Sequence, residues 1–108
     1  MRKIPLKNVP SQKFRVVLDG QNCTIALYYR FGHMYLDLYI KGVAVERGAV
    51  VRNRAAIIKI ANSNFTGSLH MVDMLGADEV GDKYKELGTR FVLLYLSDGE
   101  SIPEGLRY

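Results

Sequence analysis

The sequence predicts an all-β protein: a small antiparallel β-barrel or sandwich of about seven strands, with one long loop that can hold a short helical turn. Three observations predict this fold. Apolar and polar residues alternate at a period of two, turn signals recur about every eight to twelve residues, and there is room for one helical turn at most. The length of 108 residues suits one hydrophobic core. We therefore divide the chain into an N-terminal arm (1–12), a β-barrel domain (13–97) and a C-terminal tail (98–108).

The first predicted elements form a hairpin. Residues 13–18 and 22–30 alternate in hydrophobicity, and Asp19-Gly20 between them is a strong signal for a tight turn. Phe-Gly-His at 31–33 predicts the next turn. The clearest strand follows at 34–40, where every second residue is apolar.

The next strands are shorter. A strand over 43–46 is expected to end at Arg47-Gly48. The β-branched isoleucines within 50–61 favour a strand there, although Arg54-Ala55-Ala56 could start a helix.

The last part of the chain contains two strands and a long loop. Residues 67–74 alternate and predict a strand that ends near Asp73. The segment 75–89 is rich in glycine and charge, which predicts a functional loop with one helical turn from Asp82 to Leu87. The strand at 91–96 is apolar on both faces, so we expect other elements or a partner chain to cover both of its sides.

The alternation also predicts the core, because residues in phase on separate strands point to the same side. The expected inward residues are Phe14, Val16, Leu18, Ile25, Leu27, Leu36, Leu38, Ile58, Leu69, Met71, Leu93 and Tyr95.

Composition excludes several classes of protein. Fifteen Lys and Arg against eleven Asp and Glu give a net charge of +4, which is weak for a nucleic-acid binder. Cys23 is the single cysteine, so a disulfide-stapled secreted domain is excluded and a reducing compartment is expected. Pro5 and Pro10 interrupt the N-terminus, which lacks the apolar run of a signal peptide, and no stretch is long enough for a membrane-spanning helix. We expect no membrane partner.

The residues that could support catalysis or metal binding do not form a recognisable motif. His33, His70 and Cys23 have no zinc-site spacing, and Ser68 beside His70 lacks a nucleophile-elbow sequence. We predict no enzyme, no cofactor and no metal. Four acidic residues near the long loop miss the calcium-loop pattern and are expected to be solvated: Asp73, Asp78, Glu79 and Asp82.

Aromatic and basic residues leave two interpretations open. A small β-barrel could stack single-stranded nucleic acid on tyrosines and contact phosphates with arginines. Alternatively, the tyrosines cover a sheet face or a protein interface, which we favour. The residues concerned are Tyr28, Tyr29, Arg30, Phe31, Tyr35, Tyr39, Arg47, Arg52, Arg54 and Lys59.

The order of residues resembles a known family. The segments that carry the resemblance are Ile4-Pro5-Leu6, Pro10, Gln12-Lys13-Phe14, Leu18-Asp19-Gly20-Gln21, Ile25-Ala26-Leu27-Tyr28, Tyr35-Leu36-Asp37-Leu38, Gly48, Gly67-Ser68-Leu69, Leu87-Gly88 and Arg90-Phe91-Val92-Leu93-Leu94-Tyr95. Through them the chain is similar, over about residues 4–96, to the small baseplate plug family of contractile-tailed bacteriophages, described in cyanophage.

The resemblance implies a structural virion protein of the tail baseplate, made in the bacterial host cytoplasm. Such a protein would plug or organise the axial hub and tube end, contact hub, spike and tail-tube proteins, and self-associate in a threefold or sixfold ring. The arm and the loop could pack on their own barrel or dock onto neighbouring subunits, with Arg2, Lys3 and Lys7 meeting acidic surface. The expected interface residues are Ile4, Leu6, Val9, Tyr28, Tyr35, Tyr39, Leu75, Val80 and Tyr84.

Overall fold

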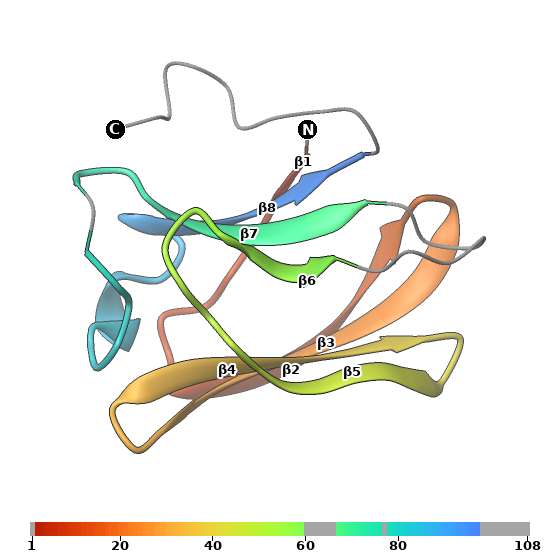
Figure 1. The fold of residues 1–108 in the computed structure, drawn as a ribbon, viewed down its shortest axis with the longest axis horizontal. Coiled ribbons are helices and arrows are strands. Elements are labelled where there is room, and N and C mark those ends of the chain that lie inside the picture. The colour runs from red at the N-terminus through yellow and green to blue at the C-terminus, as the bar shows by residue number, and fades with distance from the viewer. Residues whose placement is uncertain (1, 60–66, 77, 98–108) are drawn as a thin grey trace.

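The protein is a β-sandwich of two four-stranded antiparallel sheets (Figure 1). The computed structural model describes residues 2–59, 67–76 and 78–97. The strands are β1 (Arg2–Ile4), β2 (Ser11–Leu18), β3 (Gln21–Arg30), β4 (His33–Ile40), β5 (Val43–Val50), β6 (Ala56–Lys59), β7 (Ser68–Asp73) and β8 (Phe91–Leu96).

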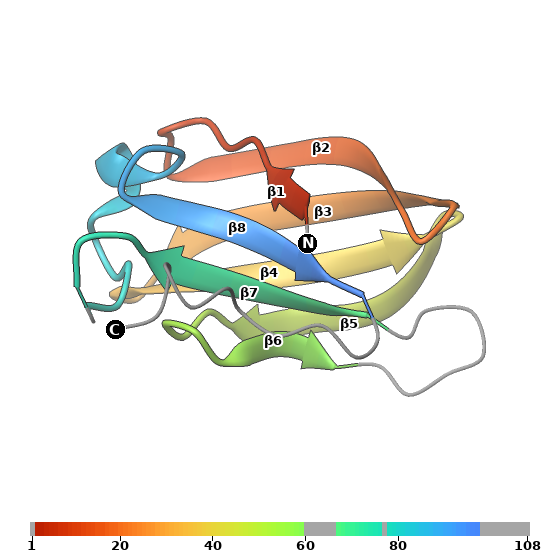
Figure 2. The same ribbon diagram turned by 90° about the horizontal axis from the view of Figure 1, so that it is seen from above.

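One sheet has the order β1-β8-β7-β6 and the other β2-β3-β4-β5. The two lie as separate layers in Figure 1, and Figure 2 looks from above onto the sheet that contains β8 and β7. The all-β prediction is confirmed, and the sandwich is the correct one of its two alternatives. The barrel is wrong because the sheets are not joined at their edges. The edge strands β1 and β6 have only three and four residues, too few to form the ladders with the β2–β5 sheet that would close a barrel. Within the described residues, no helix is long and apolar enough to span a membrane.

Three tight turns build the β2–β5 sheet. Each consists of two residues with positive φ, the geometry of type I′ turns, whose twist matches that of the strands they connect. The predicted hairpin around Asp19-Gly20 is therefore confirmed, whereas the turn expected over 31–33 is shorter because His33 already begins β4. The turns are Asp19-Gly20, Phe31-Gly32 and Lys41-Gly42.

Two predicted boundaries are wrong. The expected end at Arg47-Gly48 does not occur, because β5 continues through it to Val50 with register shifts against β4. Gly48 has φ +71°, so the chain bulges there and resumes pairing. The strand expected over 50–61 is limited to β6 among its described residues, and Arg54, with φ +67°, starts no helix. Residues 60 and 61 lie outside the described residues.

The first residues of the predicted arm form a strand. β1 pairs with β8, and Ile4 opposite Leu93 is buried in the core. The segment after β1 lies close to the long loop: a Cβ on Gly88 would be 2.6 Å from the backbone oxygen of Leu6. The last two residues of the expected arm, Ser11 and Gln12, begin β2. Within this chain the arm therefore packs on its own domain.

The core lies between the sheets and follows the predicted alternation. Nine of the predicted inward residues are buried in one cluster, and Phe14 and Val16 pack against it half-buried. The side chain of Ile58 lies outside the described residues. Val72, Val92 and Leu94 form a second buried cluster, so both faces of β8 are covered as expected. The nine are Leu18, Ile25, Leu27, Leu36, Leu38, Leu69, Met71, Leu93 and Tyr95.

Candidate functional site

Three tyrosines lie together on the outer face of the β2–β5 sheet, the face turned away from the core. Tyr28 on β3 is directly opposite Tyr35 on β4, and their rings stack with centroids 5.9 Å apart and planes inclined by 24°. Tyr39 is farther along β4 on the same face, because side chains alternate along a strand. All three are half-buried. We call Tyr28, Tyr35 and Tyr39 the tyrosine face; the structure thus brings together three of the predicted interface residues.

Cations lie over the rings of this face. The Lys13 Nζ atom is 5.7 Å from the centroid of the Tyr39 ring, and the Arg30 guanidinium carbon is 5.6 Å from that of Tyr28. Such contacts stabilise a cation over the negative face of an aromatic ring. The tyrosine face therefore combines flat apolar surface with positive charge.

Asp37 holds Tyr28 in place. Its Oδ1 atom accepts a hydrogen bond from the Tyr28 hydroxyl at 3.0 Å and another from the Gly48 N–H at 2.6 Å. Desolvation, followed by the bond to Asp37 and its negative charge, raises the pKa of Tyr28, so the hydroxyl remains a donor. Asp37 was not among the predicted site residues, although alternation along β4 places it on the same face as Tyr35 and Tyr39.

The other predicted interface residues lie in the arm and the loop. Ile4 and Val80 are buried in this chain's own core, whereas Leu75 is 69% exposed. Leu6, Val9 and Tyr84 are half-buried. The Tyr84 ring lies 5.7 Å from that of Tyr29, which alternates with Tyr28 and so points to the other side of β3. The structure therefore does not bring Tyr84 to the tyrosine face.

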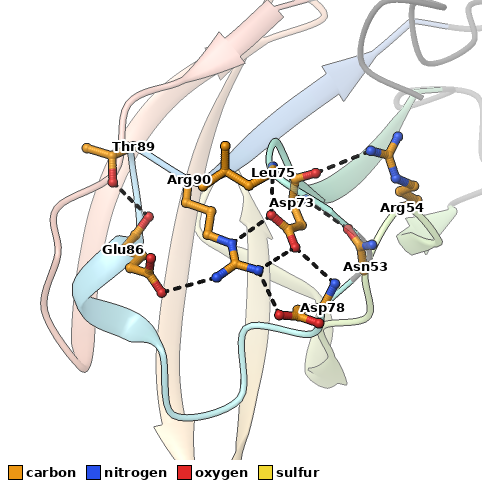
Figure 3. A network of polar contacts seen from close by, with 8 residues as sticks. All are labelled: Asn53, Arg54, Asp73, Leu75, Asp78, Glu86, Thr89 and Arg90. Carbon is orange, nitrogen blue, oxygen red and sulfur yellow. Dashed lines mark hydrogen bonds and ion pairs between the residues drawn. The ribbon is translucent and has the colours of Figure 1, made fainter. Parts of the chain in front are cut away.

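A polar network joins the two ends of the long loop (Figure 3). The Asp73 carboxylate accepts hydrogen bonds from Arg90 Nε at 2.8 Å and Arg90 Nη2 at 2.9 Å. It also accepts hydrogen bonds from the backbone N–H groups of Leu75 and Asp78, both at 2.9 Å. Arg90 contacts Asp78 Oδ2 at 2.7 Å and Glu86 Oε2 at 3.5 Å. The loop thus folds around one buried carboxylate.

These contacts correct the expectation of a solvated carboxylate for Asp73 alone, since Asp78, Glu79 and Asp82 are exposed as expected. Asp73 is fully buried, because Arg90 and two backbone donors replace its water. The hydrogen bonds from Arg90, followed by those from Leu75 and Asp78, hold the pKa of Asp73 well below its usual range despite burial. The hydrogen bonds that Arg90 donates to the carboxylates of Asp73 and Asp78 raise the pKa of Arg90.

The network extends to the segment before β6. The Asp73 N–H donates to Asn53 Oδ1 at 2.8 Å, and Arg54 Nη2 donates to the Asp73 carbonyl at 3.2 Å (Figure 3). Glu79 Oε2 accepts the Asn53 N–H at 2.5 Å. Since Arg54 is engaged here, it is not part of a basic surface beside the tyrosines.

Groups with reactive side chains have structural partners. Ser68 Oγ lies 2.8 Å from His70 Nε2, and His70 Nδ1 lies 2.8 Å from the Arg54 carbonyl oxygen, which ties the segment before β6 to β7. Cys23 is buried, and this burial raises the pKa of its thiol. Within residues 2–59, 67–76 and 78–97, no three His, Cys, Asp or Glu side chains are grouped as a metal site would require.

The aromatic residues named for nucleic-acid stacking are divided between surfaces. Tyr28 and Tyr35 stack on each other, Tyr29 packs on Tyr84, and Phe31 is 89% exposed in a turn. A row of free ring faces, which base stacking requires, is therefore not assembled by these residues.

Comparison with known proteins identifies the family. A model of the family described as cyanophage baseplate Pam3 plug gp18 matches residues 1–98. No curated protein matches the chain. The family is one of structural baseplate proteins rather than enzymes. Because the match spans nearly the whole sequence, the chain belongs to the cyanophage baseplate plug family.

Proposed function

We propose that this protein plugs or organises the axial end of the tail tube and hub in a phage or prophage baseplate and contributes to tail assembly. The family match over residues 1–98 supports the baseplate role. In the proposal the protein is made in the bacterial host cytoplasm and contacts hub, spike and tail-tube proteins. It also self-associates in a threefold or sixfold ring, which the open edges of its sheets permit.

The observation that carries the proposed contact surface is the stacked pair Tyr28 and Tyr35 outside the core. Tyrosine is enriched at protein interfaces because it offers a large apolar area with one polar group and few rotatable bonds. The hydrogen bond that the Tyr28 hydroxyl donates to Asp37 holds Tyr28 before any partner arrives, so little side-chain entropy is lost on association. The exposed Leu75 in the loop adds a second apolar contact.

Complementation of a phage that lacks this gene tests the proposal. A Tyr35→Ala, Tyr39→Ala double variant should melt within a few degrees of wild type but be depleted from purified particles about tenfold or more. Tyr35→Phe, which keeps the ring and its stacking on Tyr28, should enter particles normally. Normal incorporation of the double variant would exclude the tyrosine face as a contact. Absence of the wild-type protein from particles would exclude the baseplate role.

Salt dependence separates this proposal from the alternative of a small β-barrel protein that binds single-stranded nucleic acid. Phosphate binding weakens steeply as salt increases, because condensed counterions are released on binding. A largely apolar protein interface depends far less on salt. We expect no salt-sensitive binding to an oligo-deoxythymidine.

A further inference from the structure

β2 is a long edge strand with a regular unpaired side. Its eight residues pair with β3 on one side only, and β2 ends the sheet. Its pairing has no register shift, whereas β5 at the opposite edge is interrupted by bulges. Bulges and twists protect an edge from adding another strand. The described pairing of β2 contains no such bulge.

The hairpin geometry determines which backbone groups face outward. In a two-residue hairpin the residues flanking the turn share both hydrogen bonds, so Leu18 and the even-numbered residues of β2 bond to β3. The Pro10 carbonyl accepts a hydrogen bond from the Tyr29 N–H at 2.8 Å, so this even-numbered residue also bonds toward β3. Lys13 and Arg15 therefore direct their N–H and C=O groups away from the sheet.

The outer side of β2 already binds one donor. The Arg2 guanidinium donates a hydrogen bond to the Val17 carbonyl, which points to the same outer side of β2 as the carbonyls of Lys13 and Arg15. No hydrogen bond between the described residues uses the backbone N–H or C=O of Lys13 or Arg15. These four groups repeat at the spacing of a strand ladder.

An open groove of about 1230 Å³ runs between the arm and β2. The Gln12 amide anchors the arm beside it, donating to the Lys7 carbonyl at 2.7 Å and accepting the Lys7 N–H at 3.0 Å. No Asp or Glu is among the described residues that line the groove. Its cations are Arg2, Lys7, Lys13, Arg15 and Lys41.

We propose that β2 accepts an extended acidic segment of another baseplate protein as a fifth strand of its sheet. The unpaired N–H and C=O groups of Lys13 and Arg15 would bond to its backbone, and the groove cations would pair with its carboxylates. The class of partner rests on the proposed function; the strand edge and the groove charge are properties of this chain alone.

Two other occupants fit the groove less well. Antiparallel pairing with β2 of a second copy would bring the Lys13 and Arg15 side chains of both copies together, which like charges disfavour. Nucleic acid would leave the outward carbonyl groups without donors from its phosphates. Among the described residues that line the groove, it would also find Phe14, half-buried against the core, as the one aromatic ring.

A matched pair of variants tests the backbone contact. Arg15→Pro removes the outward N–H and the charge of residue 15 but leaves the bonds to β3, whereas Arg15→Ala removes only the charge. In the complemented phage, Arg15→Pro should enter particles about tenfold less than Arg15→Ala, with a similar melting temperature. Equal incorporation of the two folded variants would overturn the proposal.

A charge reversal covers the case in which Arg15→Pro does not fold. Lys13→Glu with Arg15→Glu should abolish incorporation, whereas Arg52→Glu, an exposed arginine outside the groove, should have no effect. Normal incorporation of the double reversal would overturn the proposal. A photocrosslinker placed at position 13 should join this chain, inside particles, to an acidic segment of a different protein.

Other occupants would be recognised directly. Crosslinks at position 13 to a second copy alone would overturn the proposal. Binding of an oligo-deoxythymidine would also overturn it, if the double reversal abolishes that binding and the Arg15→Pro and Arg15→Ala variants bind equally well. If particles contain the wild-type protein but not the variants, the result shows that the β2 edge is needed for incorporation. If the wild-type protein is itself absent from particles, the baseplate role is contradicted.

Discussion

The buried carboxylate of Asp73 and the guanidinium of Arg90 form two hydrogen bonds, at 2.8 and 2.9 Å, that join the end of β7 to the residue before β8. The Met74 N–H donates to the Arg90 carbonyl at 2.8 Å and closes the same junction through the backbone. The loop that carries the exposed Leu75 therefore begins and ends at one ion pair. Its position relative to the sandwich depends on that pair.

Acid should weaken the fold through Asp73. Its pKa is lowered in the folded state, so the unfolded chain takes up a proton at higher pH than the folded chain does. The stability it contributes is complete above the unfolded pKa of about 3.9 and is lost progressively as the pH falls below it. Chemical denaturation of wild type and Asp73→Asn from pH 7 to pH 2.5 should show the two stabilities converging below about pH 4. A constant difference across this range would contradict the prediction.

Leu36→Ala should destabilise the protein by about 2–5 kcal/mol, because this fully buried side chain leaves a cavity between the sheets. Val43→Ala is the control, since Val43 is 67% exposed, and should cost less than about 1 kcal/mol. Urea denaturation measures both. A loss below about 0.5 kcal/mol for Leu36→Ala would show that β4 faces the wrong way.

Gly88→Ala should be more destabilising than Gly32→Ala. Both glycines have nearly the same positive φ, +85° and +83°, so the backbone strain of an alanine is similar at the two positions. Only at Gly88 does the added Cβ meet another segment, 2.6 Å from the Leu6 carbonyl oxygen; nothing lies within 4 Å at Gly32. Thermal melting of the two variants isolates the contact between arm and loop. Equal melting temperatures would show that the arm moves away at no cost.

The Cys23 thiol should react slowly with a disulfide reagent in the native protein. It is 1% exposed, and burial raises its pKa, so both access and thiolate are reduced. In denaturant the rate should rise by about a hundredfold or more, because reaction of the native protein requires local opening. Rapid native labelling would show that the β2–β3 hairpin opens readily.

The local pattern of the chain determined the β2–β5 sheet and the tyrosine face. Tight-turn dipeptides set the hairpin register, and a period of two then placed Tyr35, Asp37 and Tyr39 on one side and Leu36 and Leu38 on the other. These features depend on neighbours within a few residues. They could therefore be predicted without knowing how the two sheets pack.

Tertiary structure alone decided the remaining features. A three-residue strand carries too little alternation to be recognised, so β1 is identified only by its pairing with β8, about ninety residues away. Gly48 gives the same signal whether a strand ends or bulges, and pairing with β4 selected the bulge. Asp73 is buried because Arg90 supplies the charge that offsets its desolvation, and that partner lies seventeen residues away across a loop. Each outcome depends on contacts that form only when the sandwich assembles, which a periodic pattern within one strand does not encode.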